Sequence, residues 1–262
     1  MNLRSHTTEE TITYQTTYQP VSRNNTPSSP TAMSTSNTFV VQPTEAHTHT
    51  VIFLHGRDSV ASEFAEEFFE SQASDERTIL SIYPSIKWVF PESGSLSSQR
   101  FDTEMSQWFD MWSTEHPHDK EDISRAGIEA AIPRITDLIE KEAKLVSPSH
   151  ILMGGISQGS AVAIHALLHS KLQIGGYLGF STWLPFYEEF NTQITTPVYL
   201  AHNRDDEIIS ISHGEKMRDT LQQLRAEVTW REYEEGGHWF NEPQGVDDIV
   251  AFLRRCGVTS PS

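Results

Sequence analysis

The stretch Ile151-Leu152-Met153-Gly154-Gly155-Ile156-Ser157-Gln158-Gly159 decides the fold of this chain. Its apolar first part predicts a strand over residues 150–155, and the small and apolar residues that follow predict a helix over 158–169. The pattern Gly-x-Ser-x-Gly at such a junction is typical of a nucleophile elbow, whose sharp turn raises the serine hydroxyl above the sheet. The two glycines fit that turn because a Cβ at either position would crowd the strained Ser157 backbone. An ordinary tight strand–helix turn is the alternative interpretation of the string alone.

Outward from this junction, predicted strands alternate with predicted helices. Short β-branched and apolar runs predict strands over residues 38–41, 50–54, 80–83, 87–90, 150–155, 176–180, 198–202 and 228–233. Apolar residues at three- and four-residue spacing predict helices over 121–146, 158–169, 214–224 and 246–255. Pro133 lies inside the first of these helices and should kink it or shift its start. The alternation predicts an α/β fold: a single domain with a mostly parallel central sheet flanked by helices.

The two ends of the chain are interpreted separately from the part between them. Residues 1–37 are mostly Ser, Thr, Asn, Gln and Pro, a composition that cannot bury enough apolar surface to fold, so we predict a disordered N-terminal tail. A mitochondrial transit peptide is the alternative for this segment, and Glu9 and Glu10 count against it. We place the folded domain at residues 38–256 and a short C-terminal tail at 257–262.

The composition argues against several classes of function. With 19 basic and 36 acidic residues the formal net charge is −17, which opposes binding to nucleic acid or to an anionic membrane. The single cysteine, Cys256, leaves no disulfide framework and no cysteine-based zinc site. Glu115-His116-Pro117-His118-Asp119 matches no zinc motif and is interpreted as a solvated loop, so we predict no metal and no cofactor. No apolar run approaches the roughly 18 residues that span a bilayer, and no secretory signal is evident, so we expect a cytoplasmic protein.

A serine nucleophile needs a base and a carboxylate that orients the base, and the chain offers both downstream of Ser157. The predicted strand 198–202 ends in Asn203-Arg204-Asp205-Asp206, which puts two carboxylates at the same edge of the sheet as the elbow. The predicted strand 228–233 leads into Glu234-Glu235-Gly236-Gly237-His238. His238 is therefore the candidate base, in the chain order serine, carboxylate, histidine.

Two backbone N–H groups are candidates for binding the oxyanion that forms when a serine attacks a carbonyl. One belongs to Gln158, directly after the nucleophile. The other belongs to Arg57, in the loop Leu54-His55-Gly56-Arg57 that follows an early strand. We expect His55 to hold this loop by packing or hydrogen bonding rather than to act as a base.

Five strings of the chain resemble the acyl-protein thioesterase / phospholipase–carboxylesterase family of α/β-hydrolases. They are Leu54-His55-Gly56, Trp108-Phe109-Asp110, Gly154-Gly155-Ile156-Ser157-Gln158-Gly159, Trp183-Leu184-Pro185 and Glu234-Glu235-Gly236-Gly237-His238. The resemblance extends from about residue 38 to residue 255. It implies the α/β-hydrolase fold and a Ser-His-Asp triad that cleaves S-acyl thioesters, lysophospholipids or small esters. It also implies that Asp206 rather than Asp205 is the catalytic carboxylate, and that Trp108 and Trp183 flank the acyl site.

At four positions the chain departs from the family pattern, and the departures resemble a fungal-like carboxylesterase variant. They are Asp58, Ser59, Thr182 and Glu207. None belongs to the triad, so we expect a small-molecule ester or acyl-thioester substrate, with S-acylated proteins as a further candidate. Two alternatives would use the same scaffold: an acyltransferase that passes the acyl group to an alcohol or amine, and a catalytically silent binding protein. No oligomeric state is predicted.

Overall fold

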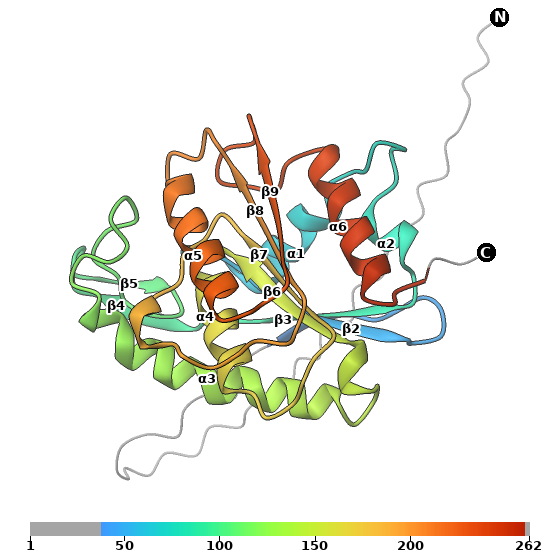
Figure 1. Ribbon diagram of the computed structural model, residues 1–262, viewed down its shortest axis with the longest axis horizontal. Helices are drawn as coiled ribbons and strands as arrows, with labels where there is room; N and C mark the ends of the chain where they lie inside the picture. Colours follow the sequence, from blue (N-terminus) through green and yellow to red (C-terminus); the bar gives the residue numbers. More distant parts are fainter. Residues whose placement is uncertain (1–37, 260–262) are drawn as a thin grey trace, which may run out of the picture.

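The computed structural model describes residues 38–259, in which helices cover both faces of a central sheet (Figure 1). Within that part of the chain, seven strands run in the order β1-β3-β2-β6-β7-β8-β9, and every neighbouring pair is parallel except β1 with β3. The strands are β1 (Thr38–Val41), β2 (His49–Leu54), β3 (Ile86–Pro91), β6 (Ile151–Ile156), β7 (Gly176–Phe180), β8 (Val198–Asn203) and β9 (Val228–Tyr233). The predicted α/β fold with a mostly parallel central sheet is confirmed.

The parallel strands place the loops that follow them at one edge of the sheet. β6, β7, β8 and β9 are consecutive neighbours, so their carboxyl ends lie side by side along that edge. All six residues of β6 are buried, as expected for a central strand covered on both faces. Ser157 directly follows β6, and the loops after β8 and β9 contain Asp206 and His238, so the topology brings these three residues to the same edge.

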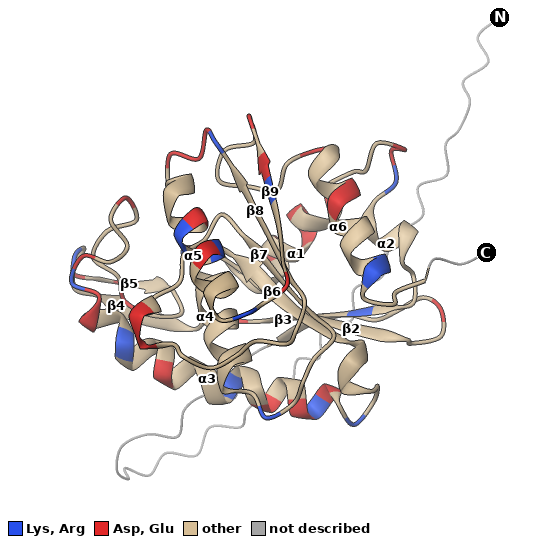
Figure 2. Ribbon diagram, viewed as in Figure 1, with Lys and Arg blue, Asp and Glu red and all other residues tan. Residues whose placement is uncertain are grey.

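Two groups of helices bury the two faces of the sheet in separate apolar clusters. One group is α3 (Asp122–Glu142), α4 (Ser157–His169) and α5 (Ile211–Gln223), and the other is α1 (Ala61–Glu70), α2 (Ile79–Ile82) and α6 (Gln244–Arg255). α4 is buried from Ser157 to Leu167 because it lies between the sheet and α3. Figure 2 shows the charged residues on the outer helices and loops, whereas β6 and β7 carry none.

Residues 80–83, which we predicted as a strand, form the helical turn α2 and the residue that ends it. The Thr78 hydroxyl accepts a hydrogen bond from the Ser81 N–H and so starts the helix. Ile79 and Ile82, three residues apart, are both buried on one side of this turn. The strand prediction was wrong because a four-residue apolar run fits a strand and a single helical turn equally well.

Pro133 lies inside α3, which begins at Asp122 and continues to Glu142. The start of the helix is therefore not shifted by the proline, and the alternative, a kink, stays a prediction. Proline removes the hydrogen bond that the Glu129 carbonyl would otherwise accept. Pro133 and Glu129 are both exposed, so water can hydrate that carbonyl and the helix continues at a reduced cost.

A helix and a hairpin had no counterpart among the predictions. One is α1, whose apolar residues 61, 64, 65, 68 and 69 are all buried on one helical face. This spacing is visible in the sequence and would have predicted the helix. The other is a hairpin of β4 (Ser95–Ser98) and β5 (Thr103–Ser106), which forms a separate two-stranded sheet. Its residues are mostly polar and exposed, so no alternation of apolar residues marks them as strands.

The described structure begins at the predicted start of the domain and continues past its predicted end. The predicted tail at residues 1–37 lies outside the described residues, as do the last three residues of the predicted tail at 257–262. Val258 is fully buried, and its N–H donates to the Leu253 carbonyl (3.1 Å). The packed structure therefore continues two residues beyond the predicted domain end. Among the helices of residues 38–259, none has the length and apolar character to cross a membrane.

Val258→Ala should lower the free energy of unfolding by about 2 kcal/mol, because it removes two buried methyl groups from the cluster that includes α6. Thr259→Ala, at the exposed neighbouring position, should change it by less than about 0.5 kcal/mol. Urea denaturation followed by tryptophan fluorescence measures both variants. Equal effects of the two substitutions would mean that Val258 does not belong to the core.

Candidate active site

Ser157 stands at a sharp turn between β6 and α4. Its φ angle is 54°, a left-handed conformation that residues with a side chain seldom adopt. A Cβ added to Gly159 would collide with the His55 carbonyl oxygen, and one added to Gly155 would collide with the same segment. The elbow is therefore pressed against the end of β2. From the loop after β7, the Thr182 hydroxyl donates to the Ser157 carbonyl (2.9 Å) and ties the elbow to the next strand.

His238 and Asp206 meet at the carboxyl edge of the sheet. His238 Nδ1 lies 2.8 Å from Asp206 Oδ2 and 3.0 Å from Oδ1. Because an ionised carboxylate can only accept, Nδ1 carries the hydrogen, and Nε2 of the neutral ring is left as a proton acceptor. The Asp206 side chain is fully buried, whereas the His238 side chain is 23% exposed. Within residues 38–259 no hydrogen bond joins the Ser157 hydroxyl to His238, and such bonds commonly tighten only when substrate binds.

Three further groups hold the Asp206 carboxylate. The N–H groups of Ile208 and Ile209 both donate to Oδ1 (2.9 Å each). His202 Nε2 lies 3.3 Å from Oδ2 and donates to the Ile209 carbonyl (2.8 Å). Burial alone would raise the pKa of Asp206, but the hydrogen bonds from His202 and His238 outweigh it and hold that pKa well below its usual range. The carboxylate is therefore ionised and fixed in orientation.

Asp205, the neighbouring carboxylate, contacts the backbone of the His238 loop rather than the imidazole. Its oxygens accept hydrogen bonds from the N–H groups of Gly236 (3.2 Å) and Gly237 (2.8 Å). Two adjacent carboxylates thus bind one loop in different ways. These contacts support Asp206 over Asp205 as the orienting carboxylate, and its catalytic role stays a prediction.

The loop after β2 lies against the nucleophile, since a Cβ added to Gly56 would lie 3.6 Å from the Ser157 Cβ. His55 holds this loop through both ring nitrogens. Its Nδ1–H donates to the Gly56 carbonyl (2.7 Å), and its Nε2 accepts from the Ser93 N–H (3.1 Å). Burial lowers the pKa of His55 to about 4, so the neutral ring that makes both contacts persists at neutral pH.

Arg57 and Gln158 remain the predicted oxyanion donors. Gln158 is the second residue of α4, where N–H groups have no partner inside the helix and the helix dipole favours negative charge. In the loop after β2, the N–H of Asp58 is already bonded to the Ser106 carbonyl (2.8 Å). The Asp58 N–H is therefore already used, and the Arg57 N–H stays the predicted donor of this loop.

The Gln158 side chain has a second role that sequence reasoning missed. Its Oε1 accepts from the Trp108 N–H (2.8 Å), and its Nε2 donates to the Phe109 carbonyl (2.7 Å). The Trp108 indole N–H in turn donates to the His55 carbonyl (2.9 Å). The segment that contains Trp108 is thereby fixed to both sides of the predicted oxyanion site. No sequence signal marks a glutamine whose partners are distant backbone groups.

Trp108 and Trp183 are buried, with 2% and 1% of their surface exposed. Trp183 packs against the Phe109 ring in an edge-to-face arrangement, with ring centroids 6.1 Å apart. Their burial makes both indoles part of the packed interior. Direct contact of either residue with an acyl chain stays a prediction.

The residues considered as metal ligands do not form a metal centre in the described part of the chain. Between residues 38 and 259, no group of three or more His, Cys, Asp or Glu side chains could hold an ion. In the loop interpreted as solvated, His118 Nδ1 instead lies 2.8 Å from the Glu121 carboxylate. Burial raises the pKa of Cys256 to about 11, which keeps this thiol protonated and unreactive at neutral pH.

Comparison with protein families gives a match to phospholipase/carboxylesterase over residues 35–257. A protein of Yarrowia lipolytica named acyl-protein thioesterase 1 is 31% identical over 222 residues, which cover 79% of this chain and 92% of that protein. A protein of Gibberella zeae with the same name is 29% identical over 225 residues, which cover 80% of this chain and 91% of that protein.

Solved structures of low sequence identity share the fold. Zea mays acyl-protein thioesterase 2 superposes with a TM-score of 0.66 at 22% identity, over 84% of this chain and 98% of that one. A Bacillus cereus carboxylesterase superposes with a TM-score of 0.64 at 15% identity, over 86% of this chain and 96% of that one. The fold is therefore that of the α/β-hydrolase carboxylesterases.

Asp206→Asn should lower kcat for a short-chain aryl ester by about 10⁴, with KM little changed, because the amide cannot hold the imidazole tautomer or stabilise the imidazolium. Asp205→Asn makes the same chemical change one residue away and should lower kcat less than about tenfold, since only backbone contacts of an exposed group are weakened. The assays require variants of equal melting temperature. If kcat falls strongly in Asp205→Asn and not in Asp206→Asn, then Asp205 rather than Asp206 is the orienting carboxylate.

The protein should lose stability as the pH falls from 6.5 towards 4. Burial lowers the pKa values of His55 and His165 to about 4, so in this window the unfolded state binds more protons than the folded state. Each histidine contributes up to about 3 kcal/mol of this loss at pH 4. Urea unfolding at a series of pH values measures the slope. His55→Gln, which cannot titrate, should unfold with a slope smaller by one proton, and an unchanged slope would contradict the burial argument.

Proposed function

This chain belongs to the phospholipase/carboxylesterase family, and we propose that it cleaves carboxylic esters or acyl thioesters through a triad of Ser157, His238 and Asp206. Family membership makes it a serine ester/thioester hydrolase. One observation carries the proposed triad: the His238 ring is bonded through Nδ1 to the buried Asp206 carboxylate, at the sheet edge where Ser157 occupies a strained elbow.

In the first half of the proposed reaction, the Ser157 oxygen attacks the acyl carbonyl carbon while the hydroxyl proton passes to His238 Nε2. Asp206 stabilises the imidazolium through Nδ1–H. The negative oxygen of the tetrahedral intermediate accepts hydrogen bonds from the N–H groups of Arg57 and Gln158. The bond from carbon to the leaving oxygen or sulfur then breaks, and the Nε2 proton goes to the leaving alcohol or thiol. An acyl-enzyme ester on Ser157 remains.

In the second half, water replaces the alcohol or thiol. His238 Nε2 accepts a proton from the water as the water oxygen attacks the acyl-enzyme carbonyl. The same two N–H groups bind the second oxyanion. Collapse of this intermediate breaks the bond to Ser157, whose oxygen takes the proton back from Nε2, and the carboxylic acid leaves. The dipole at the start of α4 favours both oxyanions, because the N–H groups of the first turn have no partner inside the helix.

The surface near this edge supports an apolar acyl group as one part of the substrate. Ile208, two residues after Asp206, is 46% exposed, and Phe101 in the β4–β5 hairpin is 49% exposed beside the Arg57 guanidinium (5.8 Å to the ring centroid). The net charge of −17 disfavours approach to an anionic lipid surface. We therefore propose small acyl esters and acyl thioesters in solution as the main substrates. S-acylated proteins, suggested by the names of the relatives, are the second candidate.

Two alternatives use the same scaffold and make different products. An acyltransferase would pass the acyl group to an added alcohol or amine, so the new ester or amide would exceed the free acid. A catalytically silent binding protein would form no product, and the intact Asp206–His238 pair argues against it. Product analysis of an ester and a thioester series, with and without an acceptor, distinguishes all three functions.

Ser157→Ala should lower kcat by on the order of 10⁶, because it removes the group that forms the acyl-enzyme. Its melting temperature should stay close to that of the wild type, since one hydroxyl at a turn contributes little packing. A fluorophosphonate probe followed by peptide mass spectrometry should label Ser157 and no other residue. Ser160→Ala, three residues along α4, is the matched control for site selectivity. Labelling of another serine in the Ser157→Ala variant would overturn the assignment of the nucleophile.

A further inference from the structure

We propose that Asn203 is a positioning residue that holds His238 at the distance and orientation at which it meets Asp206. The proposal rests on the proposed catalytic role of His238. Asn203 is the last residue of β8 and is 2% exposed. It lies three residues before Asp206 in the chain, so one short segment contains both the orienting carboxylate and this amide.

The Asn203 amide is hydrogen-bonded to the backbone directly before and directly after His238. Its Nδ2 donates one hydrogen bond to the Gly237 carbonyl (2.9 Å) and a second to the Trp239 carbonyl (2.7 Å). These are the carbonyls of the residues directly before and directly after His238. Two fixed points of this kind leave the Cα of His238 little freedom to move, and the side chain is then aimed by its bond to Asp206.

The loop needs such a contact because its own backbone is irregular. Gly236 has a φ of 142° and Gly237 a φ of 60°, both in the region that favours glycine, so neither helix nor strand hydrogen bonding can hold these residues. A Cβ on Gly236 would lie 2.6 Å from Asn203 Nδ2. The glycine therefore lets the loop lie flat against the amide. β8 and β9 pair in register with Asn203 opposite Tyr233, which brings the start of the loop beside the amide.

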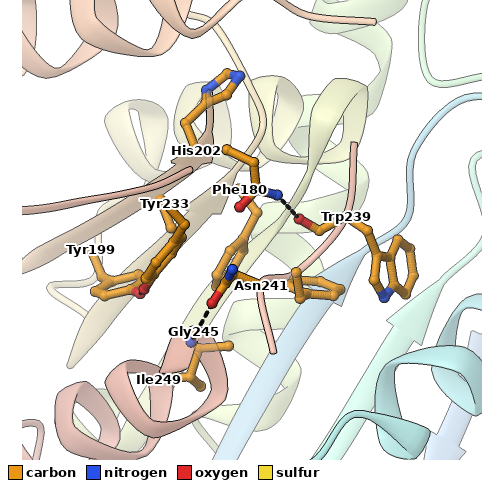
Figure 3. Close-up of a pocket in the computed structure, with 11 residues that line it drawn as sticks. Phe180, Tyr199, His202, Tyr233, Trp239, Asn241, Gly245 and Ile249 are labelled. Carbon is orange, nitrogen blue, oxygen red and sulfur yellow. Dashed lines mark hydrogen bonds between the residues drawn. The ribbon is translucent and has the colours of Figure 1, made fainter. Parts of the chain in front are cut away.

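The chemistry of Asn203 favours a role through its donors over a packing role. Its Oδ1 is buried and has no hydrogen-bond partner among residues 38–259, and a buried unpaired acceptor costs stability. A small cavity of about 10 Å³ lies beside it, and Figure 3 shows Tyr233, Trp239 and Asn241 around this space. An apolar side chain would avoid the unpaired oxygen, but it could not donate to the Gly237 and Trp239 carbonyls. Only the two carbonyl contacts explain an amide at this position.

Asp205 binds the same loop as Asn203, but through exposed rather than buried contacts. It binds the N–H groups of Gly236 and Gly237 from the outside, where the groups are exposed and water competes. Asn203 binds the carbonyls from the inside, where water does not compete and a hydrogen bond is worth more. Loss of the buried contact should therefore displace His238 more than loss of the exposed one.

The test compares Asn203→Leu, which keeps the number of side-chain heavy atoms and removes both donors, with Tyr199→Phe. Tyr199 lines the same cavity, and its hydroxyl lies 3.1 Å from the Tyr233 hydroxyl rather than bonding the backbone of residues 236–239. Kinetics on a short-chain aryl ester, melting temperatures and the downfield proton resonance of His238 Nδ1–H are measured for both. Asn203→Leu should lose 10- to 100-fold in kcat with KM within threefold, and its Nδ1–H resonance should shift or broaden. Tyr199→Phe should keep kcat and the resonance.

Two outcomes would contradict the argument, and a further variant is used if Asn203→Leu does not fold. If Asn203→Leu melts lower but keeps kcat within threefold and leaves the resonance unchanged, Asn203 is only structural and the proposal fails. If His238→Ala, assayed in parallel, keeps wild-type activity, the proposed triad fails instead. Should Asn203→Leu not fold, Asn203→Ser, a smaller polar replacement that cannot reach both carbonyls, carries the same measurements and the same thresholds.

Discussion

The candidate active site at the carboxyl edge of the sheet depends on one contact: the turn at Ser157 packs closely against the end of β2. The Leu54 and His55 carbonyl oxygens occupy the space that a Cβ on Gly155 or Gly159 would need. This contact sets the positions of both N–H groups proposed to bind the oxyanion, since one follows the turn and the other follows the strand. The left-handed backbone of Ser157 costs on the order of 1–3 kcal/mol, which the burial of α4 between the sheet and α3 can offset.

The segment from His202 to Asp206 divides the support of one imidazole among several polar side chains. The Asp206 carboxylate accepts a hydrogen bond from the ring nitrogen of His238, and His202 lies beside that carboxylate. The Asn203 amide donates to two backbone carbonyls of the loop, and the Asp205 carboxylate accepts from two of its backbone N–H groups. Each contact restricts a different freedom of the loop after β9. A parallel sheet makes this arrangement available, because the ends of β8 and β9 are neighbours at the same edge.

Much of this fold could be predicted from the sequence because buried parallel strands are short apolar runs, and the elbow string has a fixed structural context. Residues 80–83 were mistaken for a strand because one helical turn and one short strand have the same apolar content. The tolerance of α3 for Pro133 depends on which side of the helix faces water, which is a tertiary fact. The supporting roles of Gln158 and Asn203 could not be predicted for a different reason. Their partners are backbone groups distant in the chain, and because every residue carries such groups, the sequence does not show which of them form a bond.

The two predicted oxyanion donors differ in how freely their positions can evolve. Gln158 is fully buried, and its side chain is bonded to the Trp108–Phe109 segment, so exchange at this position would disturb the elbow and its surroundings together. Arg57 would contribute through its backbone, while its side chain, 17% exposed, extends towards Asp58 and Phe101. Mutation at position 57 can therefore remodel the surface beside the nucleophile and leave the peptide N–H in place. A substitution at position 158 would instead remove the two bonds that hold the Trp108–Phe109 segment.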